Sequence, residues 1–387
     1  MTITSRESHD EGRGLRTHLP IPIHQRIPTL DGWRAVAIIA VILSHSRHLI
    51  EPGGTFPAAT LDAILAWFRL GVDLFFAISG FLITTLIVRE QQASGGFSLR
   101  QFYTRRVFRI LPLVLTYLLI LAIAKVWIPA IAQPWEFGST LLLCRNYFMH
   151  RSGGVATNHF WSLSIEEHFY LLWPIILGIW GARRGMVAAV IGAIVVAAWR
   201  ALDARTGLFR GLVGVDPGAL FRTDTRCDAL LWGAVAGLVA PRMRDLAARW
   251  SGVPWSPLLL AVLVAWIHWD LPVLSSALAV AFPLIVLSTT LRPECATSHL
   301  LETGPLRWIG QRSYSMYIWQ TLFLQVDQIS FSRKAGASPI GAVARYAIDL
   351  ALIALTSELT HRVIEKPAQK YGKRLALQAQ ARLGVST

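Results

Sequence analysis

The sequence is poor in charged residues and in cysteine. Charged side chains occupy 16% of its 387 positions, and cysteine occurs three times, at Cys144, Cys227 and Cys295. An odd number of distant cysteines without metal-ligand spacing argues against a disulfide framework and against a zinc site, so we expect no metal. Residues 1–25 also lack the apolar core and the cleavage site of a secretory signal peptide.

Long apolar segments are what the sequence has in abundance. Hydrophobic residues make up 53% of the chain and the mean hydropathy is +0.47, values that would oblige a water-soluble protein to expose large apolar patches. Because a membrane-spanning helix needs about 20 predominantly apolar residues, the sequence predicts an all-α integral membrane protein, a bundle of about ten transmembrane helices. The expected spans are residues 34–50, 70–88, 110–128, 161–180, 186–200, 227–240, 256–270, 273–291, 308–328 and 341–362.

The basic residues predict the orientation in the membrane. Lysine and arginine outnumber aspartate and glutamate by 37 to 23, but they are spread between the apolar segments and do not form the single basic surface of a nucleic-acid-binding protein. Nearly twice as many lysines and arginines fall on the side of the membrane that holds the N-terminus as on the opposite side. This excess predicts a multi-pass protein of the plasma membrane with both termini cytosolic. We expect a disordered tail at 1–25, one membrane domain at 26–370 and a cytosolic tail at 371–387 that continues as a surface helix.

Two ionisable residues, Arg34 and His45, belong to the first apolar segment. Eleven helical positions turn almost a whole number of times, so the two side chains share one face, roughly 16 Å apart along the axis. Ionisable groups inside a membrane are costly and usually functional. An imidazole can accept the proton of an attacking hydroxyl, so we interpret His45 as catalytic; the other interpretation is a histidine that packs against a polar neighbour such as Ser44.

Six blocks along the chain resemble, in the same order, those of the acyltransferase 3 family of integral-membrane acyltransferases. The resemblance covers about residues 26 to 370. The blocks are LDGWR at 30–34, GVDLFFAISGF at 71–81, FYTRRVFRILP at 102–112, FWSLSIEEHFY at 160–170, SYSMYIW at 313–319 and IEKP at 364–367.

This resemblance implies transfer of an acyl group, commonly acetyl, from cytosolic acyl-CoA to a hydroxyl. The implied acceptor is a sugar, a glycan or a glycosylated small molecule such as a macrolide, which leaves antibiotic biosynthesis open as a context. Acyl-CoA, with acetyl-CoA expected, would be a co-substrate, and no bound cofactor is expected. The alternative from another class is a membrane transporter or exporter of a glycan or anionic substrate.

The chain departs from the family pattern at two positions. Many relatives carry histidine where this chain has Gln320, and many carry glutamine where it has His168. An amide cannot accept a proton at neutral pH, so any proton-accepting role of a histidine at position 320 is lost or moved in this chain.

Three arginines are the expected acyl-CoA ligands, namely Arg34, Arg106 and Arg109. Arg106 and Arg109 are three positions apart and therefore share a helical face, and guanidinium groups match phosphate oxygens with paired hydrogen bonds. The alternative is that a basic cluster at the cytosolic boundary only fixes topology or contacts anionic lipid.

Carboxylates supply the remaining catalytic candidates, Asp73 and Glu166. Asp73 could orient the His45 imidazole or could pair with an arginine and hold the bundle together. Glu166 and Glu167 point about 100° apart on a helix, so we expect one of them to face inward, and the family motif favours Glu166. Further charges lie in or near the apolar spans, Arg226 with Asp228 and Glu358 with Glu365; we expect structural pairing inside the bundle, and the alternative is recognition of the acceptor. The residues expected to bind the acceptor or support the site are Ser79, Glu167, Tyr317 and Glu365.

Overall fold

The computed structural model describes residues 27–46, 58–249, 272–331 and 339–383. These residues form helices and turns and contain no strand, which confirms the all-α prediction. Three stretches in them are long and apolar enough to cross a membrane, Trp67–Ser94, Leu99–Ala124 and Val155–Thr206. The predicted count of ten spans is not confirmed. The tail predicted at 1–25 and the span predicted at 256–270 lie outside the described residues.

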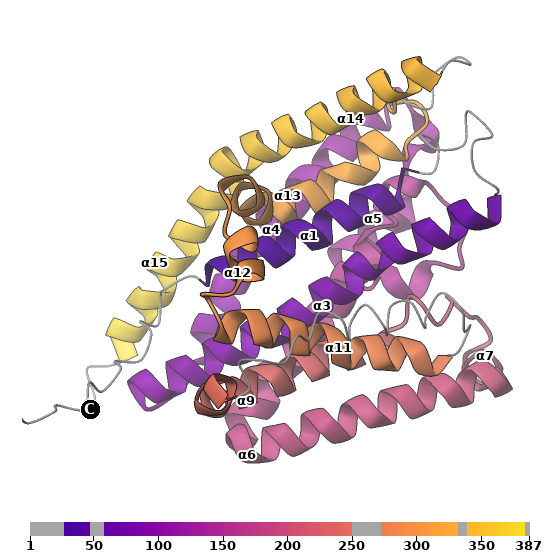
Figure 1. Cartoon of the computed structure of the whole chain (residues 1–387). Helices are drawn as coiled ribbons and strands as arrows, with labels where there is room; N and C mark the ends of the chain where they lie inside the picture. The colour runs from indigo at the N-terminus through magenta and orange to yellow at the C-terminus, as the bar shows by residue number, and fades with distance from the viewer. Residues whose placement is uncertain (1–26, 47–57, 250–271, 332–338, 384–387) are drawn as a thin grey trace, which may run out of the picture.

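The other nine predicted spans each overlap a helix in Figure 1. The long helices are α1 (Pro28–Ser44), α3 (Ala58–Ser94), α4 (Leu99–Ala124), α6 (Phe160–Thr206), α9 (Asp228–Arg249), α11 (Pro272–Leu291), α13 (Gly304–Leu324) and α14 (Pro339–Thr360). The short helices and helical turns are η2 (Pro129–Ile131), α5 (Pro134–Leu141), η3 (Arg145–Phe148), η4 (Val155–Thr157), α7 (Leu208–Val213), α8 (Thr223–Arg226) and α12 (Ala296–Leu301).

Two predicted spans, 161–180 and 186–200, share the single element α6, which bends at Gly181. The backbone of Gly181 has φ +67° and ψ 176°, a conformation that costs glycine little and other residues much more. The bend lies between the two predicted spans within this element of 47 residues.

The chain ends in helix α15 (Lys366–Leu383), which follows α14 through a π-helical turn, His361–Glu365. Figure 1 shows α14 and α15 as one long yellow arm along a side of the bundle, with α6 along the opposite side. Because α15 begins before residue 370 and continues past it, no break in secondary structure marks the predicted start of the C-terminal tail.

Helix α4 presents an apolar face outward. Leu115, Leu119 and Ile123, spaced at helical intervals, are 49%, 61% and 50% exposed. Exposure of this apolar stripe to water is unfavourable in a soluble protein, whereas the apolar tails of lipids can cover it. These faces and the long apolar helices agree that this is a membrane protein.

Close helix contacts hold the elements that carry the site. A Cβ on Gly80 of α3 would lie 1.9 Å from the Leu230 carbonyl oxygen of α9, and one on Gly310 of α13 would lie 1.7 Å from the Asp31 carbonyl oxygen of α1. Only glycine permits these backbones to approach so closely. Gly80 thus sets the close approach of α3 and α9 beside the site residue Ser79.

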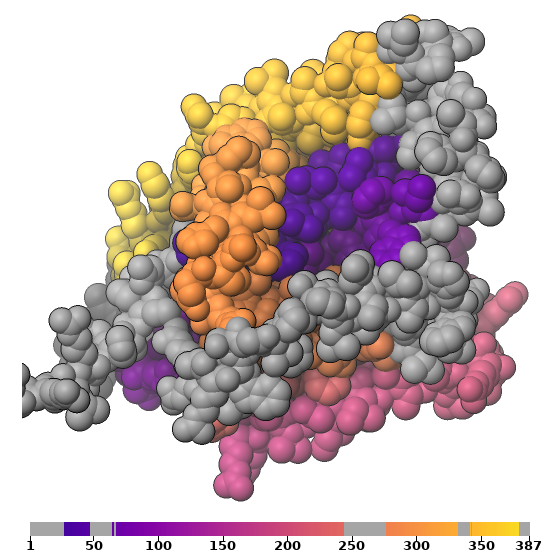
Figure 2. Space-filling model, viewed as in Figure 1, coloured from indigo at the N-terminus to yellow at the C-terminus, as the bar shows by residue number. Residues whose placement is uncertain are grey.

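The face of the molecule in Figure 2 leaves part of α1 uncovered. Its indigo surface lies beside the orange segment around α12 and the start of α13, with the purple surface of α3 next to it. Val36 and Ile39 of α1 are each 37% exposed. The α1 helix is therefore a wall of the bundle, buried on the side that faces α3 and α13.

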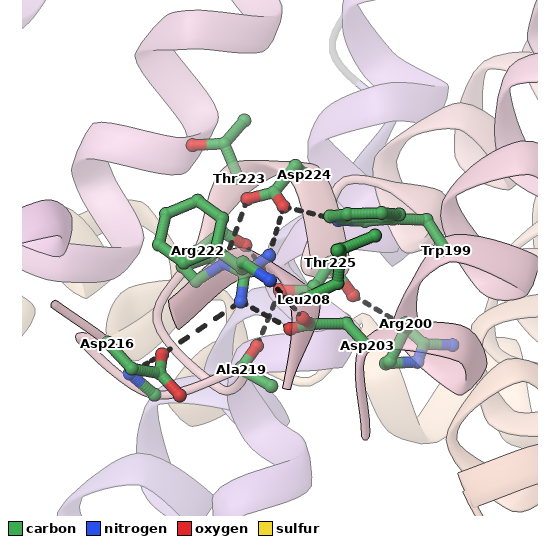
Figure 3. A network of polar contacts seen from close by, with 12 residues as sticks. Trp199, Arg200, Asp203, Leu208, Asp216, Ala219, Arg222, Thr223, Asp224 and Thr225 are labelled. Carbon is green, nitrogen blue, oxygen red and sulfur yellow. Dashed lines mark hydrogen bonds and ion pairs between the residues drawn. The ribbon is translucent and has the colours of Figure 1, made fainter. Parts of the chain in front are cut away.

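The segment between α6 and α9 is held by a buried arginine, Arg222, at the centre of the network in Figure 3. Its guanidinium donates to Asp203 and Asp224, each at 2.5 Å, lies 3.9 Å from Asp216 and covers the Phe209 ring at 3.4 Å. Burial by itself would lower the pKa of Arg222, but the hydrogen bonds to Asp224 and Asp203 raise it above its ordinary value. The arginine stays charged and fixes the segment.

Candidate active site

A polar cavity lies between α1, α3, α4, α6 and α13. Together with the space at its opening to solvent, it holds about 680 Å³ that protein atoms do not occupy. Its wall combines three cations, a carboxylate and several hydroxyl groups, which is the composition of a site for an anionic and polar ligand. The cavity brings together six of the residues predicted from the sequence: Arg34, Ser79, Arg106, Arg109, Glu166 and Tyr317.

A second cavity adjoins the first and shares Arg34, Arg109 and Tyr314 with it. It is also lined by Arg89 near the end of α3 and by Glu365 in the π-helical turn that follows α14. In the predicted topology this end of the bundle faces the cytosol. The two cavities therefore form a passage whose outer part is bordered by Arg89 and whose inner part is bordered by Arg34, Arg106 and Arg109.

The three predicted acyl-CoA ligands differ in their partners. Arg106 donates to Glu167 at 3.3 Å and lies over the Tyr170 ring at 3.5 Å. The closest carboxylate oxygen to Arg34 belongs to Asp31, at 3.9 Å. Arg109 forms neither an ion pair nor a hydrogen bond within the described part of the chain. Within the described residues, Arg109 therefore has no carboxylate partner, and the ion pair of Arg34 with Asp31 is a long one.

The adjacent glutamates Glu166 and Glu167 lie on different sides of α6. Glu166 lines the central cavity and accepts hydrogen bonds from Ser79 at 3.1 Å and from Tyr170 at 3.3 Å. Glu167 binds Arg106 and borders a separate groove between α4 and α6. Of the two, only Glu166 is placed to contact a molecule in the central cavity.

His45 follows the last residue of α1 and contacts α13. Its Nδ1 lies 2.7 Å from the Oε1 atom of Gln320, and the Gln320 amide in turn donates to the Thr321 hydroxyl at 3.1 Å. Since the amide oxygen only accepts, Nδ1 carries the proton and Nε2 keeps its lone pair. This is the tautomer that a general base needs at Nε2.

The inner end of the central cavity lies between the arginines and His45. His45 does not line the cavity; Phe75, Ser162 and Tyr317 do. The hydroxyls of Ser162 and Tyr317 lie 2.6 Å apart in the wall of the cavity. Tyr317 is three positions before Gln320, so one face of α13 presents both the end of the cavity and the partner of His45.

Asp73 adopts the second of its two predicted roles. Its Oδ1 accepts a hydrogen bond from Arg226 at 2.7 Å, while Gln320 occupies the Nδ1 position of His45. Arg226 thus pairs with α3, and Asp228 pairs with Arg200 at 2.8 Å. Asp73 therefore pairs α3 with the end of α8, and Gln320 holds the Nδ1 atom of His45 in its place.

The two other carboxylates predicted to support the bundle lie near the end of α14. Glu358 pairs with Arg312 and Arg362. Glu365 accepts from Ser315 and lies 3.2 Å from the Nδ1 atom of His361. Because Glu365 also borders the outer cavity, it is placed to support the entrance rather than the inner end of the passage.

The family of this chain follows from a comparison with known protein families. A family model described as "Acyltransferase domain" matches residues 27–333. The chain belongs to this acyltransferase family. The resemblance seen in the six sequence blocks is thereby confirmed.

Two relatives of this acyltransferase are named for O-acetyl transfer. The chain is 29% identical over 379 residues to the peptidoglycan O-acetyltransferase OatA of Listeria monocytogenes, covering 89% of the chain and 56% of that protein. It is 27% identical over 373 residues to the O-acetyltransferase OatA of Staphylococcus aureus, covering 89% and 58%. The chain thus spans little more than half the length of these relatives. No solved structure matches it.

Several residues of the acyltransferase site were not identified from the sequence. Tyr170 contacts Glu166 one helical turn away, a spacing that could have revealed it. Ser162 and Gln320 meet their partners across 155 and 275 positions. No local pattern signals such pairings.

We expect Gln320→Leu to slow acyl transfer roughly tenfold, because His45 would lose the acceptor that fixes its tautomer. The KM for the acyl donor should not change, since Gln320 does not line either cavity. Steady-state kinetics of the purified variant measure both constants. Thr321→Val, which leaves the His45 contact in place, is the matched control; equal losses in the two variants would contradict the role of Gln320.

Proposed function

We propose that this protein is an acyl-CoA-dependent O-acetyltransferase that acetylates a hydroxyl of a glycan or a glycosylated molecule. The observation that carries the proposal is the passage from Arg89 past Arg34 and Arg109 to Tyr317, one helical turn from the residue that holds His45. Family membership supports acyl transfer, and the names of the relatives support a glycan acceptor.

In the proposed reaction, acyl-CoA enters from the cytosol with its phosphates on Arg34, Arg106 and Arg109. The thioester arm extends along the passage toward His45. Both termini of this multi-pass plasma-membrane protein are cytosolic in this proposal, which places the arginine entrance on the side where acyl-CoA is found. No bound cofactor takes part, because the thioester itself supplies the activated acyl group.

The chemical step is proton transfer coupled to attack on the thioester. His45 Nε2 takes the proton of the acceptor hydroxyl while its oxygen forms a bond to the acyl carbonyl carbon. The tetrahedral oxyanion collapses, the carbon–sulfur bond breaks, and the leaving thiolate receives a proton from the imidazolium. A second version forms an acyl-histidine intermediate at Nε2, which the acceptor hydroxyl then attacks.

The decisive experiment combines purified protein, radiolabelled acetyl-CoA and a panel of acceptors that contains peptidoglycan fragments, exopolysaccharide and glycosylated macrolides. We expect label to enter one acceptor class, with release of free CoA that depends on that acceptor. The rival function is transport of a glycan or anion along the same arginines. Uptake of such a substrate into vesicles without release of CoA would favour the rival and overturn the proposal.

We expect Arg109→Gln to raise the KM for acetyl-CoA roughly 10- to 100-fold, because a charge-assisted contact to phosphate is lost. Arg109 is the arginine of the central cavity that no carboxylate of the described chain neutralises, so little folding stability should be lost with it. Arg100→Gln removes an exposed charge near the start of the same helix and is the control. An unchanged KM for Arg109→Gln would show that the donor binds elsewhere.

A further inference from the structure

His159, directly before α6, is a buried imidazole without a hydrogen bond. The residue is 4% exposed, and neither ring nitrogen has a partner among the residues that the structure describes. Buried polar groups are nearly always paired, because an unpaired one has lost its hydrogen bonds to water without replacement. A histidine left in this state calls for an explanation.

Aromatic rings surround the imidazole of His159. Tyr117, Phe160 and Tyr317 surround it, with ring centroids 5.6, 4.3 and 5.4 Å away. The Tyr117 hydroxyl donates to the Ala156 carbonyl at 2.6 Å, and the Tyr317 hydroxyl donates to the His159 carbonyl. Both phenols are therefore committed to the backbone. An apolar side chain would fill this position at lower cost to folding than an imidazole.

The His159 ring lies next to a residue of the central cavity, where the proposed reaction takes place. Tyr317 and Ser162 line the central cavity, and the Tyr317 hydroxyl donates to the backbone carbonyl of His159. The His159 ring also contacts the Tyr317 ring, so one residue separates His159 from the cavity. His45, held by Gln320 one turn further along α13, lies behind the same Tyr317 and within electrostatic reach of His159.

We infer that His159 binds the reacting hydroxyl of the acceptor beside His45. This inference rests on the proposed function and extends it to the acceptor. One ring nitrogen of a neutral imidazole donates and the other accepts. His159 can therefore donate to the oxygen of the acceptor hydroxyl while His45 Nε2 takes its proton. Displacement of the Tyr317 side chain would connect the two histidines with the end of the donor passage.

The test compares His159→Phe and His159→Gln with wild type, using acetyl-CoA and the acceptor of the panel that wild type acetylates fastest. We expect His159→Phe to raise the KM for the acceptor at least roughly tenfold, with an unchanged KM for acetyl-CoA and no fall in melting temperature. His159→Gln, which still donates and accepts, should stay within a few-fold of wild type. A histidine with only a structural role would not raise the KM for the acceptor while leaving the melting temperature unchanged.

His168→Phe is the matched control, because His168 is a histidine of the same helix whose Nδ1 lies 2.8 Å from the Thr223 hydroxyl. It should lose melting temperature and keep its KM for the acceptor. Wild-type acceptor KM in His159→Phe would overturn the inference, as would equal losses in the Phe and Gln variants accompanied by a lower melting temperature. In either case wild type would still transfer acetyl groups, so the proposed function would stand; absence of transfer by wild type would overturn the function itself.

Discussion

Replacement of His45 by alanine should reduce the rate of acyl transfer roughly 100- to 10,000-fold, the range typical of a positioned general base. The reason is geometric: Gln320 accepts the Nδ1 proton at 2.7 Å and leaves Nε2 as the basic nitrogen. The loss should appear in kcat, with the KM for acetyl-CoA little changed, since the arginines of the passage remain. Single-turnover kinetics with purified protein measure the effect.

His299→Ala is the matched control for this experiment, because His299 lies exposed on α12, away from both cavities. It should transfer acetyl groups at the wild-type rate. Normal transfer by His45→Ala at a normal protein level would exclude both the general-base and the acyl-histidine versions. Mass spectrometry of acid-quenched wild type distinguishes those two versions, because only the second leaves an acetyl group on the His45 peptide.

Replacement of Arg222 by methionine should have the largest effect on folding. The guanidinium is fully buried between Asp203 and Asp224, with Asp216 nearby (Figure 3), and its removal leaves carboxylates without a counter-charge. Breaking a buried pair in this way costs about 3–5 kcal/mol. The melting temperature in detergent, measured with a thiol-independent fluorescence assay, should fall accordingly.

Asp216→Asn supplies the comparison for Arg222, because the Asp216 side chain is 41% exposed and lies 3.9 Å from the same guanidinium. An exposed pair of this kind contributes about 0–1 kcal/mol, so the melting temperature should barely change. If Arg222→Met were as stable as Asp216→Asn, the network would be a local surface cluster and would not hold the segment between α6 and α9.

The sequence predicts which faces are polar better than it predicts which faces meet. Helical spacing correctly put Arg106 and Arg109 on one face and separated Glu166 from Glu167, because that geometry is local to one helix. The choice between two partners for Asp73 stayed open, since Arg226 lies 153 positions away. Pairings of that range depend on how helices pack, which no periodicity encodes.

The same limit explains what was missed at the inner end of the site. Gln320 was recognised as a departure from the family pattern, but its contact with His45 joins the first and a late helix of the bundle. His159 belongs to no local charge pattern, and only three-dimensional packing reveals that its ring nitrogens are without partners within the described residues. Apolar length, by contrast, placed nine predicted spans on eight long helices of the described part, because two of the spans fall on α6.

Helix α1 is attached to α13 near both of its ends, by the Asp31–Gly310 backbone contact and by the His45–Gln320 hydrogen bond. A rod fixed in this way keeps Arg34 and His45 a constant distance apart, roughly 16 Å along the axis. Only a donor whose phosphate and thioester are separated by a comparable length can reach both residues at once. In the proposed mechanism, a short acyl donor such as the mixed anhydride acetyl phosphate would span too little of this distance, so the rigid helix would favour donors with a long carrier arm.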